Sequence, residues 1–538
     1  MHTIELLPIE IIEQISSYIP LETYTNLRLS STVFNLPISV SLTWDTYENE
    51  IQKLQCTFLV NHINPDVSSL NCLRALKLLN HGKYKIVEQY IRLNINSLPL
   101  YGKQVIFDKA VDVGLLSLFQ IILMDKEFQS NIKSHLLLKQ LIEKKQIELF
   151  KYFVNRCKVD VSVGDSMMVD IACTNGAADV LKLLLNSKNV NPASRNNHAT
   201  QVAAKHGHLE CLRLLLDDER VDPSDRNNIA FIAATQNGHF ECLKVLLKDG
   251  RVNPAVDNNI AIRVAAMFGF SDIVKLLLTD NRVDPTVNDN NAVRIASERG
   301  NVDCVKILLD DCRVNPSERD NCAIRVAAMN GHLDCIELLL TDPRVDPAVN
   351  MNNPIRIATQ NGHYKAVKRL MEDPRVDPSD ARNNAVLVAS KFGHAECLEL
   401  LLSDSRVDPS ELDNYAIRNA ALEGHVKCVS ILLADRRVNP NALSNSALRL
   451  ACQMGHAACV YFLLRDGRVD PSDFNNNAIQ QAARNGHLDC VELLLADPRI
   501  DPMANKNYAI HAATDKGHLK CVAAMVEYMI KKTHSGIN

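Results

Sequence analysis

Apolar and polar positions form blocks that repeat along about two-thirds of the chain. In residues 220–250, the polar stretch V-D-P-S-D-R-N-N precedes a short apolar run that starts at Ala230 and ends before Gly238. A second apolar run, C-L-K-V-L-L, starts at Cys242. Both runs carry apolar residues at helical spacing, and glycine readily adopts the left-handed conformation that ends a helix. The block therefore predicts a loop, a short helix, a tight turn and a second helix.

The block has a fixed period of 31 residues. Its glycine recurs twelve times, at Gly176, Gly207, Gly238, Gly269, Gly300, Gly331, Gly362, Gly393, Gly424, Gly455, Gly486 and Gly517. A proline keeps the same period from Pro192 to Pro502, and an asparagine from Asn197 to Asn507. A constant period of this length is typical of stacked units that bury their apolar faces only against their neighbours. We therefore predict an all-α solenoid of helix–turn–helix units.

Three further columns of the repeat suggest packing rather than chemistry. An alanine six residues after each asparagine, for example Ala265, is small enough to let the first helices of adjacent units approach closely. Nine of the sixteen cysteines share one column with Val180, Ile273 and Ala366, which predicts a buried apolar site. Without any C-x-x-C pair, neither a zinc site nor a redox motif is expected. Histidine follows the glycine in nine of twelve repeats, where we expect its ring to bind turn carbonyls.

Charge is also periodic. Aspartate recurs from Asp218 to Asp497 and arginine two residues later from Arg220 to Arg499. We predict an acid–base ladder in which each row neutralises the other. The alternative, an arginine stripe for phosphate or RNA, is disfavoured because every arginine has a matching aspartate.

Overall composition narrows the function classes. The net charge is −4, aromatic residues make up 5% of the chain, and Trp44 is the single tryptophan, which argues against nucleic-acid binding. No stretch approaches 18 continuous apolar residues, and the start lacks the pattern of a signal peptide. We expect a chain in the cytoplasm, or alternatively in the nucleus, that needs no cofactor or metal and contacts neither nucleic acid nor membrane.

The block GHLECLRLLL, with a short Ala-rich helix before it and a V-D/N loop after it, resembles the ankyrin repeat from Ser162 to about Tyr528. The usual ankyrin unit has 33 residues and a T-P-L-H tetrapeptide, which is replaced here by x-Ala-Ile-Arg, as at Ala261–Arg263. The asparagine column, for example Asn259, is then the expected cap of the first helix. The resemblance implies a protein partner on the concave face, across loop tips and first helices.

The period continues upstream in degenerate form. Gly114 and Lys145 fall on the glycine register, and a segment near Gly82 lies one residue out of register. We therefore expect about fifteen repeats, of which three are degenerate, and a monomer outside its complex.

The first forty residues contain a second pattern. Residues 7–37 carry L-P-x-E, then isoleucines at helical spacing and an aromatic residue at Phe34, and they resemble an F-box. The resemblance implies docking on the Skp-type adaptor of a cullin–RING ubiquitin ligase through Leu7, Pro8, Ile12, Ile15, Ile19 and Leu27. The alternative is an amphipathic cap for the solenoid. The resulting domain prediction is an F-box-like helical domain at 1–45, a helical linker at 46–70, degenerate repeats at 71–161 and regular repeats with a C-terminal cap at 162–538.

These patterns predict a binding protein rather than an enzyme. The polar columns are the same in every repeat, and no Walker loop, GxSxG, HExxH or dinucleotide motif occurs. Three hypotheses follow: a substrate-recognition subunit of a ubiquitin ligase, a scaffold with no ubiquitin link, or an effector that uses a host's ubiquitin machinery. The two residues before each glycine vary between repeats, so the apolar residues at these positions are candidate partner contacts: Met267, Phe268, Phe392 and Met454. The alternative is that they pack against the adjacent loop.

Overall fold

The computed structural model describes residues 75, 79, 82–162 and 167–535. The chain divides into two compact units, residues 1–233 and 234–538, and each is described by itself. Within the described residues, every regular element is a helix. The predicted all-α fold is therefore confirmed.

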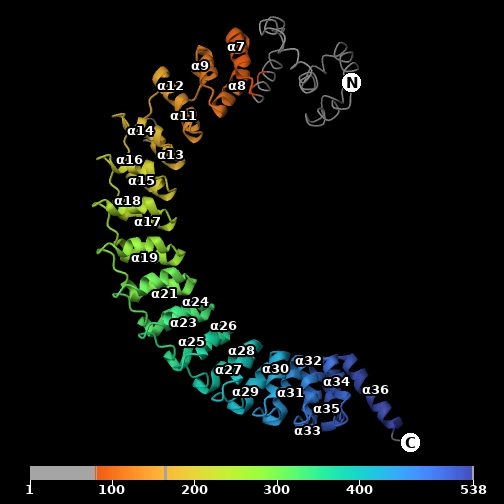
Figure 1. Cartoon of the computed structure of the whole chain (residues 1–538). Coiled ribbons are helices and arrows are strands. Elements are labelled where there is room, and N and C mark those ends of the chain that lie inside the picture. Colours follow the sequence, from red (N-terminus) through yellow and green to blue (C-terminus); the bar gives the residue numbers. More distant parts are fainter. Residues whose placement is uncertain (1–74, 76–78, 80–81, 163–166, 536–538) are drawn as a thin grey trace, which may run out of the picture. The chain divides into compact units, whose positions relative to one another are not determined.

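The described part of the first unit consists of helices α7 to α17, the last of which crosses the unit boundary (Figure 1). Their bounds are α7 (Tyr84–Asn94), the 3-10 helix η2 (Ile95–Ser97), α8 (Leu100–Val113), α9 (Leu116–Leu123), α10 (Lys126–Asn131), α11 (Ser134–Glu143), α12 (Ile147–Cys157), α13 (Met167–Asn175), α14 (Ala178–Leu185), α15 (Ser194–Lys205), α16 (Leu209–Leu216) and α17 (Asp225–Gln236). Gly82, Gly114 and Lys145 all have left-handed backbones two residues before the start of a helix. The predicted degenerate repeats at Gly114 and Lys145 are therefore helix pairs like the regular ones.

The second unit stacks helix pairs one beside the next (Figure 1). Its first helices are α19 (Val256–Phe268), α21 (Val287–Arg299), α23 (Glu318–Asn330), α25 (Val349–Gln360), α27 (Asp380–Phe392), α29 (Glu411–Leu422), α31 (Ala442–Met454), α33 (Asp473–Asn485) and α35 (Ala504–Asp515). Its second helices are α18 (Phe240–Lys248), α20 (Ser271–Leu278), α22 (Val302–Leu309), α24 (Leu333–Leu340), α26 (Tyr364–Met371), α28 (Ala395–Leu402), α30 (Val426–Ala434), α32 (Ala457–Arg465), α34 (Leu488–Leu495) and α36 (Leu519–Ser535).

Small side chains let the first helices pack closely. Each first helix of the second unit contacts the next one, and the alanine column between them is fully buried, as at Ala296 and Ala327. The nine cysteines of the second-helix column are buried as well. Burial raises the pKa of the Cys335 thiol to about 11. Both columns are therefore packing positions, as the sequence predicted.

The histidine after each glycine links one repeat to the repeat before it. In seven repeats the ring Nε2 lies 2.9–3.0 Å from a backbone carbonyl oxygen of the preceding repeat. The accepting residue stands two positions before the glycine of that preceding repeat, as Met329 does for His363. The predicted bond to a turn carbonyl is thus confirmed, and it crosses between repeats. Asn301 makes an equivalent bond to the carbonyl of Met267, whereas Phe270 places its ring over Gly238.

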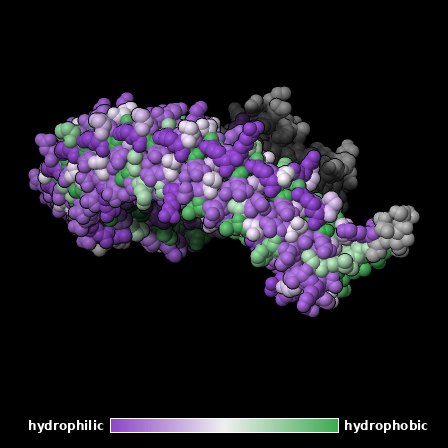
Figure 2. Space-filling model, turned by 90° about the horizontal axis from the view of Figure 1, so that it is seen from below, coloured by the Kyte–Doolittle hydropathy of each residue, from purple (hydrophilic) through white to green (hydrophobic). Residues whose placement is uncertain are grey.

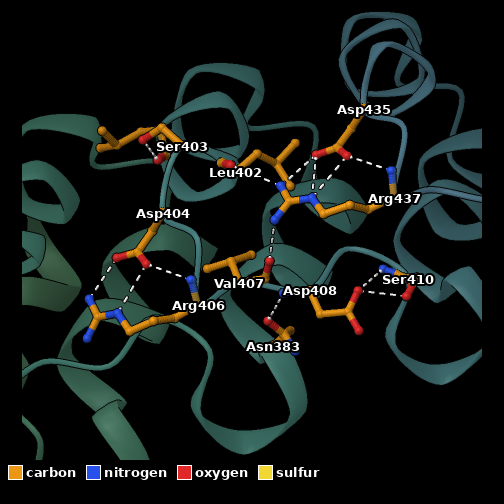
Figure 3. Close-up of polar contacts among 11 residues, drawn as sticks. Asn383, Leu402, Ser403, Asp404, Arg406, Val407, Asp408, Ser410, Asp435 and Arg437 are labelled. Atoms are coloured by element: carbon orange, nitrogen blue, oxygen red, sulfur yellow. Dashed lines mark hydrogen bonds and ion pairs between the residues drawn. The ribbon is translucent and has the colours of Figure 1, made fainter.

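The aspartate and arginine columns pair within a repeat and not between repeats. Arg406 makes a bidentate contact with Asp404, two residues earlier, and its Nη1 donates to the carbonyl of Val376 in the preceding repeat (3.0 Å). Figure 3 shows two such pairs. In one of them, Arg437 donates to the carbonyls of Val407 and Leu402. The predicted neutralisation of the two rows is correct, but the guanidinium–carbonyl bond, not the ion pair, joins the repeats.

The asparagine column has a different role from the predicted helix cap. Asn383 is the third of three consecutive left-handed residues, after Ala381 and Arg382. Its Oδ1 accepts a hydrogen bond from the backbone N–H of Asp408 in the next repeat (2.7 Å; Figure 3). The prediction that this asparagine caps its own helix is therefore wrong, because its side chain is used to join repeats.

The arginine of x-Ala-Ile-Arg supplies bonds at the start of the first helix. Arg418 donates to the carbonyls of Leu412 and Asp413 in the left-handed turn (2.9 and 3.1 Å). Arg449 does the same for Leu443 and Ser444. A long side chain thus holds the turn against the helix that follows it.

Candidate protein-binding surface

Three large apolar side chains occupy the first position of the left-handed turn in consecutive repeats. This position is polar in most repeats, for example at Asp257 and Asn288, but holds Leu412, Leu443 and Phe474 in α29, α31 and α33. Their exposed fractions are 40%, 52% and 60%. We call these three residues the turn row.

The turn row shares the left-handed backbone of the other regular repeats but carries large apolar side chains on it. Leu412, Leu443 and Phe474 have φ values of 56°, 52° and 50°, a conformation that costs a residue other than glycine, asparagine or aspartate about 1–2 kcal/mol. Strained backbone positions concentrate at functional sites. Because these side chains also gain little burial, neither packing nor backbone preference accounts for them, and they are candidates for contact with another molecule.

Arginines hold the aromatic members of this surface in place. The Arg449 guanidinium carbon lies 5.1 Å from the centre of the Phe474 ring, and that of Arg418 lies 5.1 Å from the ring of exposed Tyr415. Both arginines are already fixed by turn carbonyls. Packed helices lie about 8–10 Å apart, so the turn row spans roughly 20 Å. The result is a pre-organised, partly apolar surface with cationic groups beside it.

The sequence-predicted contact residues are exposed but not gathered together. Phe268 and Phe392 are 53% and 44% exposed, and Met454 is 49% exposed, whereas Met267 is half-buried. They lie on α19, α27 and α31, so they do not form one cluster. Phe268 stacks on Phe270 at 5.9 Å, and Phe392 stacks on His394 at 6.5 Å. Both the contact hypothesis and the packing alternative therefore stay predictions.

Sequence reasoning missed the turn row, although a signal was present. A loop column that holds large apolar residues in three successive repeats is visible in the alignment of repeats, but the exposure of these side chains is not. The F-box-like residues, from Leu7 to Leu27, lie outside the described residues.

Figure 2 shows a largely hydrophilic face with apolar residues in small scattered groups. Among the described residues, no three histidine, cysteine or acidic side chains gather as metal ligands would. The same part of the chain has no helix with the length and apolarity needed to cross a membrane.

Comparison with known protein families agrees with the helix pairs. A family model described as ankyrin repeats, in three copies, matches residues 138–227, 169–260, 203–289, 262–353, 324–413, 386–475 and 448–535. The matches overlap from 138 to 535, so none covers the N-terminal segment. The chain has no match among curated proteins.

Proposed function

This chain belongs to the ankyrin-repeat family, and on that premise we propose that it is the substrate-recognition subunit of a cullin–RING ubiquitin ligase. Ankyrin repeats are interaction modules, so the repeats bind a protein and carry out no catalysis. In this proposal the N-terminal segment docks on a Skp-type adaptor, and the repeats hold the protein that is to be ubiquitylated.

The turn row is the observation that supports a role of the repeats in binding a protein. Exposed apolar residues at strained positions fit a contact surface better than they fit a structural part of the stack. The exposed residues Phe268 and Phe392, which lie apart on α19 and α27, are further candidate contacts within the same proposal.

The adaptor part of the proposal rests on the sequence pattern alone. The L-P-x-E start, the spacing of Ile12, Ile15 and Ile19, and Leu27 support it. The alternative function is an ankyrin scaffold with no ubiquitin link, in which the same apolar residues cap the solenoid.

A pull-down with the purified Skp-type adaptor and cullin tests the adaptor part. The full chain is compared with a Leu7→Ala, Pro8→Ala variant. Binding that is lost in the variant supports the ligase role. If neither protein binds, the scaffold function replaces it.

Comparative cross-linking in cell extract tests the recognition surface. We expect Leu443→Asp with Phe474→Asp to lose a set of cross-linked proteins that the parent chain retains. The matched control is Asn288→Asp with Asn350→Asp, because these residues occupy the same left-handed position in other repeats. Equal cross-linking by all three proteins would reject the turn row and leave the Phe268→Ala, Phe392→Ala variant as the next test.

A further inference from the structure

In nine repeats, an arginine donates a hydrogen bond to a backbone carbonyl of the preceding repeat. Arg220 donates from Nη1 to the carbonyl of Val190 (2.8 Å) and from Nη2 to that of Leu185 (3.3 Å). Its Nε and Nη2 also bind Asp218. Arg468 repeats this arrangement in the second unit. A guanidinium with two backbone carbonyls and a nearby carboxylate is thus a recurring element of this protein.

One repeat lacks the arginine that would make these bonds. One period before Asp218 and Arg220, the chain has Ser187 and Asn189. By the same period, the carbonyls that would accept the missing guanidinium belong to Val159 and Val154. Asparagine is too short to take the place of an arginine that must bridge two carbonyls.

A cavity of about 390 Å³ lies at this position. Its lining includes Val154, Val159, Asp160, Ser187 and Asn189, from α12, α14 and the loops that follow them. Small-molecule pockets usually have volumes of 300–1,000 Å³. One cavity is therefore lined by Val154 and Val159, which have the expected acceptor carbonyls, and by Ser187 and Asn189, which replace the ion pair.

We propose that this cavity binds the arginine side chain of a partner protein. Arginine suits it because a planar guanidinium can reach two separate carbonyl oxygens, whereas lysine presents a single point charge. The Asp160 carboxylate adds negative charge to the lining. The one cation in the lining, Lys151, is paired with Glu148 at 2.8 Å, which limits its repulsion of a second cation.

The sequence of the regular repeats also suggests a peptide that can be tested as the ligand. The hexapeptide Asp-Asn-Arg-Val-Asp-Pro has the sequence of residues 280–285, in which Arg282 makes this set of bonds. We expect saturable binding of this peptide to the full chain in ligand-observed NMR. The same peptide with lysine in place of arginine should bind at least tenfold more weakly, since it loses the two-carbonyl contact. Failure of the arginine peptide to bind would overturn the proposal.

A variant whose own arginine fills the cavity tests the proposal directly. Ser187→Asp with Asn189→Arg rebuilds the regular pair, so the variant should lose peptide binding while its melting temperature rises. The control, Ser187→Asp with Lys188→Arg, adds the same groups in the wrong register and should keep binding. Equal binding by the parent and the filled variant, or loss of binding in both variants, would reject the cavity as the site.

This inference rests on the proposed protein-recognition role, and the two can fail separately. The Leu443→Asp, Phe474→Asp variant changes residues of the other unit and should bind the arginine peptide as the parent chain does. Loss of the cross-linked proteins with peptide binding intact would leave both proposals standing. A chain that cross-links through the turn row but binds no peptide would lose only the arginine pocket.

Discussion

Each repeat glycine meets two requirements at the scale of single residues. Gly331 has φ of 72°, and a Cβ built on it would lie 2.5 Å from Nδ1 of His363. The left-handed backbone alone favours glycine, but the histidine ring also needs the empty space above it. Glycine and histidine therefore form a pair across the repeat boundary.

A double-mutant cycle measures this pairing. Gly331→Ala should destabilise the chain by roughly 2–3 kcal/mol, because a backbone cost of about 1–2 kcal/mol adds to the clash with the ring. In a His363→Ala background, only the backbone cost remains, so the penalty should be about 1 kcal/mol smaller. Urea unfolding followed by circular dichroism gives the four values. Equal penalties in both backgrounds would show that the ring imposes no constraint.

Cysteine reactivity tests burial at the same scale. Cys335 is buried and its pKa is raised to about 11, whereas Cys312 is exposed. Only the thiolate reacts with alkylating agents. Brief treatment with iodoacetamide at pH 7.5, followed by peptide mapping, should therefore modify Cys312 and leave Cys335 intact. Similar labelling of the two would contradict the buried position of the cysteine column.

At the scale of elements, the loop between repeats depends on charge. The Arg344 guanidinium binds Asp342 and so lowers the pKa of that carboxyl group below its usual value. A lowered folded-state pKa means that the stabilisation is complete above the unfolded pKa, about 4, and is lost as the pH falls through the folded value. Ten pairs of this kind recur through the loops.

The pH dependence of unfolding should reflect these pairs. We expect the urea midpoint to change little from pH 7 to 5 and to fall steeply below about pH 4. Asp342→Asn should lower the midpoint at pH 7 and make the acid decline shallower. Asp334→Asn, which removes an exposed carboxylate from α24, is the control and should leave the decline close to that of the parent. A decline unchanged by Asp342→Asn would show that the loop pair does not contribute to it.

At the scale of the stack, the main contacts between first helices in the described part of the second unit join neighbouring repeats. Each first helix from α21 to α33 packs against the first helices before and after it. In such an array, stability is approximately the sum of repeat and interface contributions. Damage to one interface should therefore stay local, unlike damage to the core of a globular domain.

Hydrogen exchange after a core substitution tests this locality. Ala327 is fully buried on α23, so Ala327→Leu overpacks the first-helix interface by about 1–3 kcal/mol. Exchange should speed up in α21, α23 and α25 and stay unchanged in α33. Ala434→Leu, at an exposed position on α30, is the control and should change neither. Uniform loss of protection across the second unit would contradict a stack with only neighbour coupling.

The sequence by itself determined the helix pairs, their period and the buried columns. Gly331, Ala327 and Cys335 could be assigned because a side chain that must be small or apolar in every repeat leaves a periodic signal. The role of Asn383 could not, because its bond to Asp408 joins residues 25 positions apart and depends on a run of left-handed residues that no single position reveals.

Only the tertiary structure decided how the columns are used. The repeat pattern shows that Arg220 has a partner in Asp218, but the neighbouring carbonyls of Val190 and Leu185 become acceptors only once the repeats are stacked. The cavity beside Asn189 and the exposure of Phe474 arise in the same way. A periodic sequence specifies what each repeat has in common, whereas a binding surface depends on where one repeat departs from the others and on what its neighbours leave uncovered.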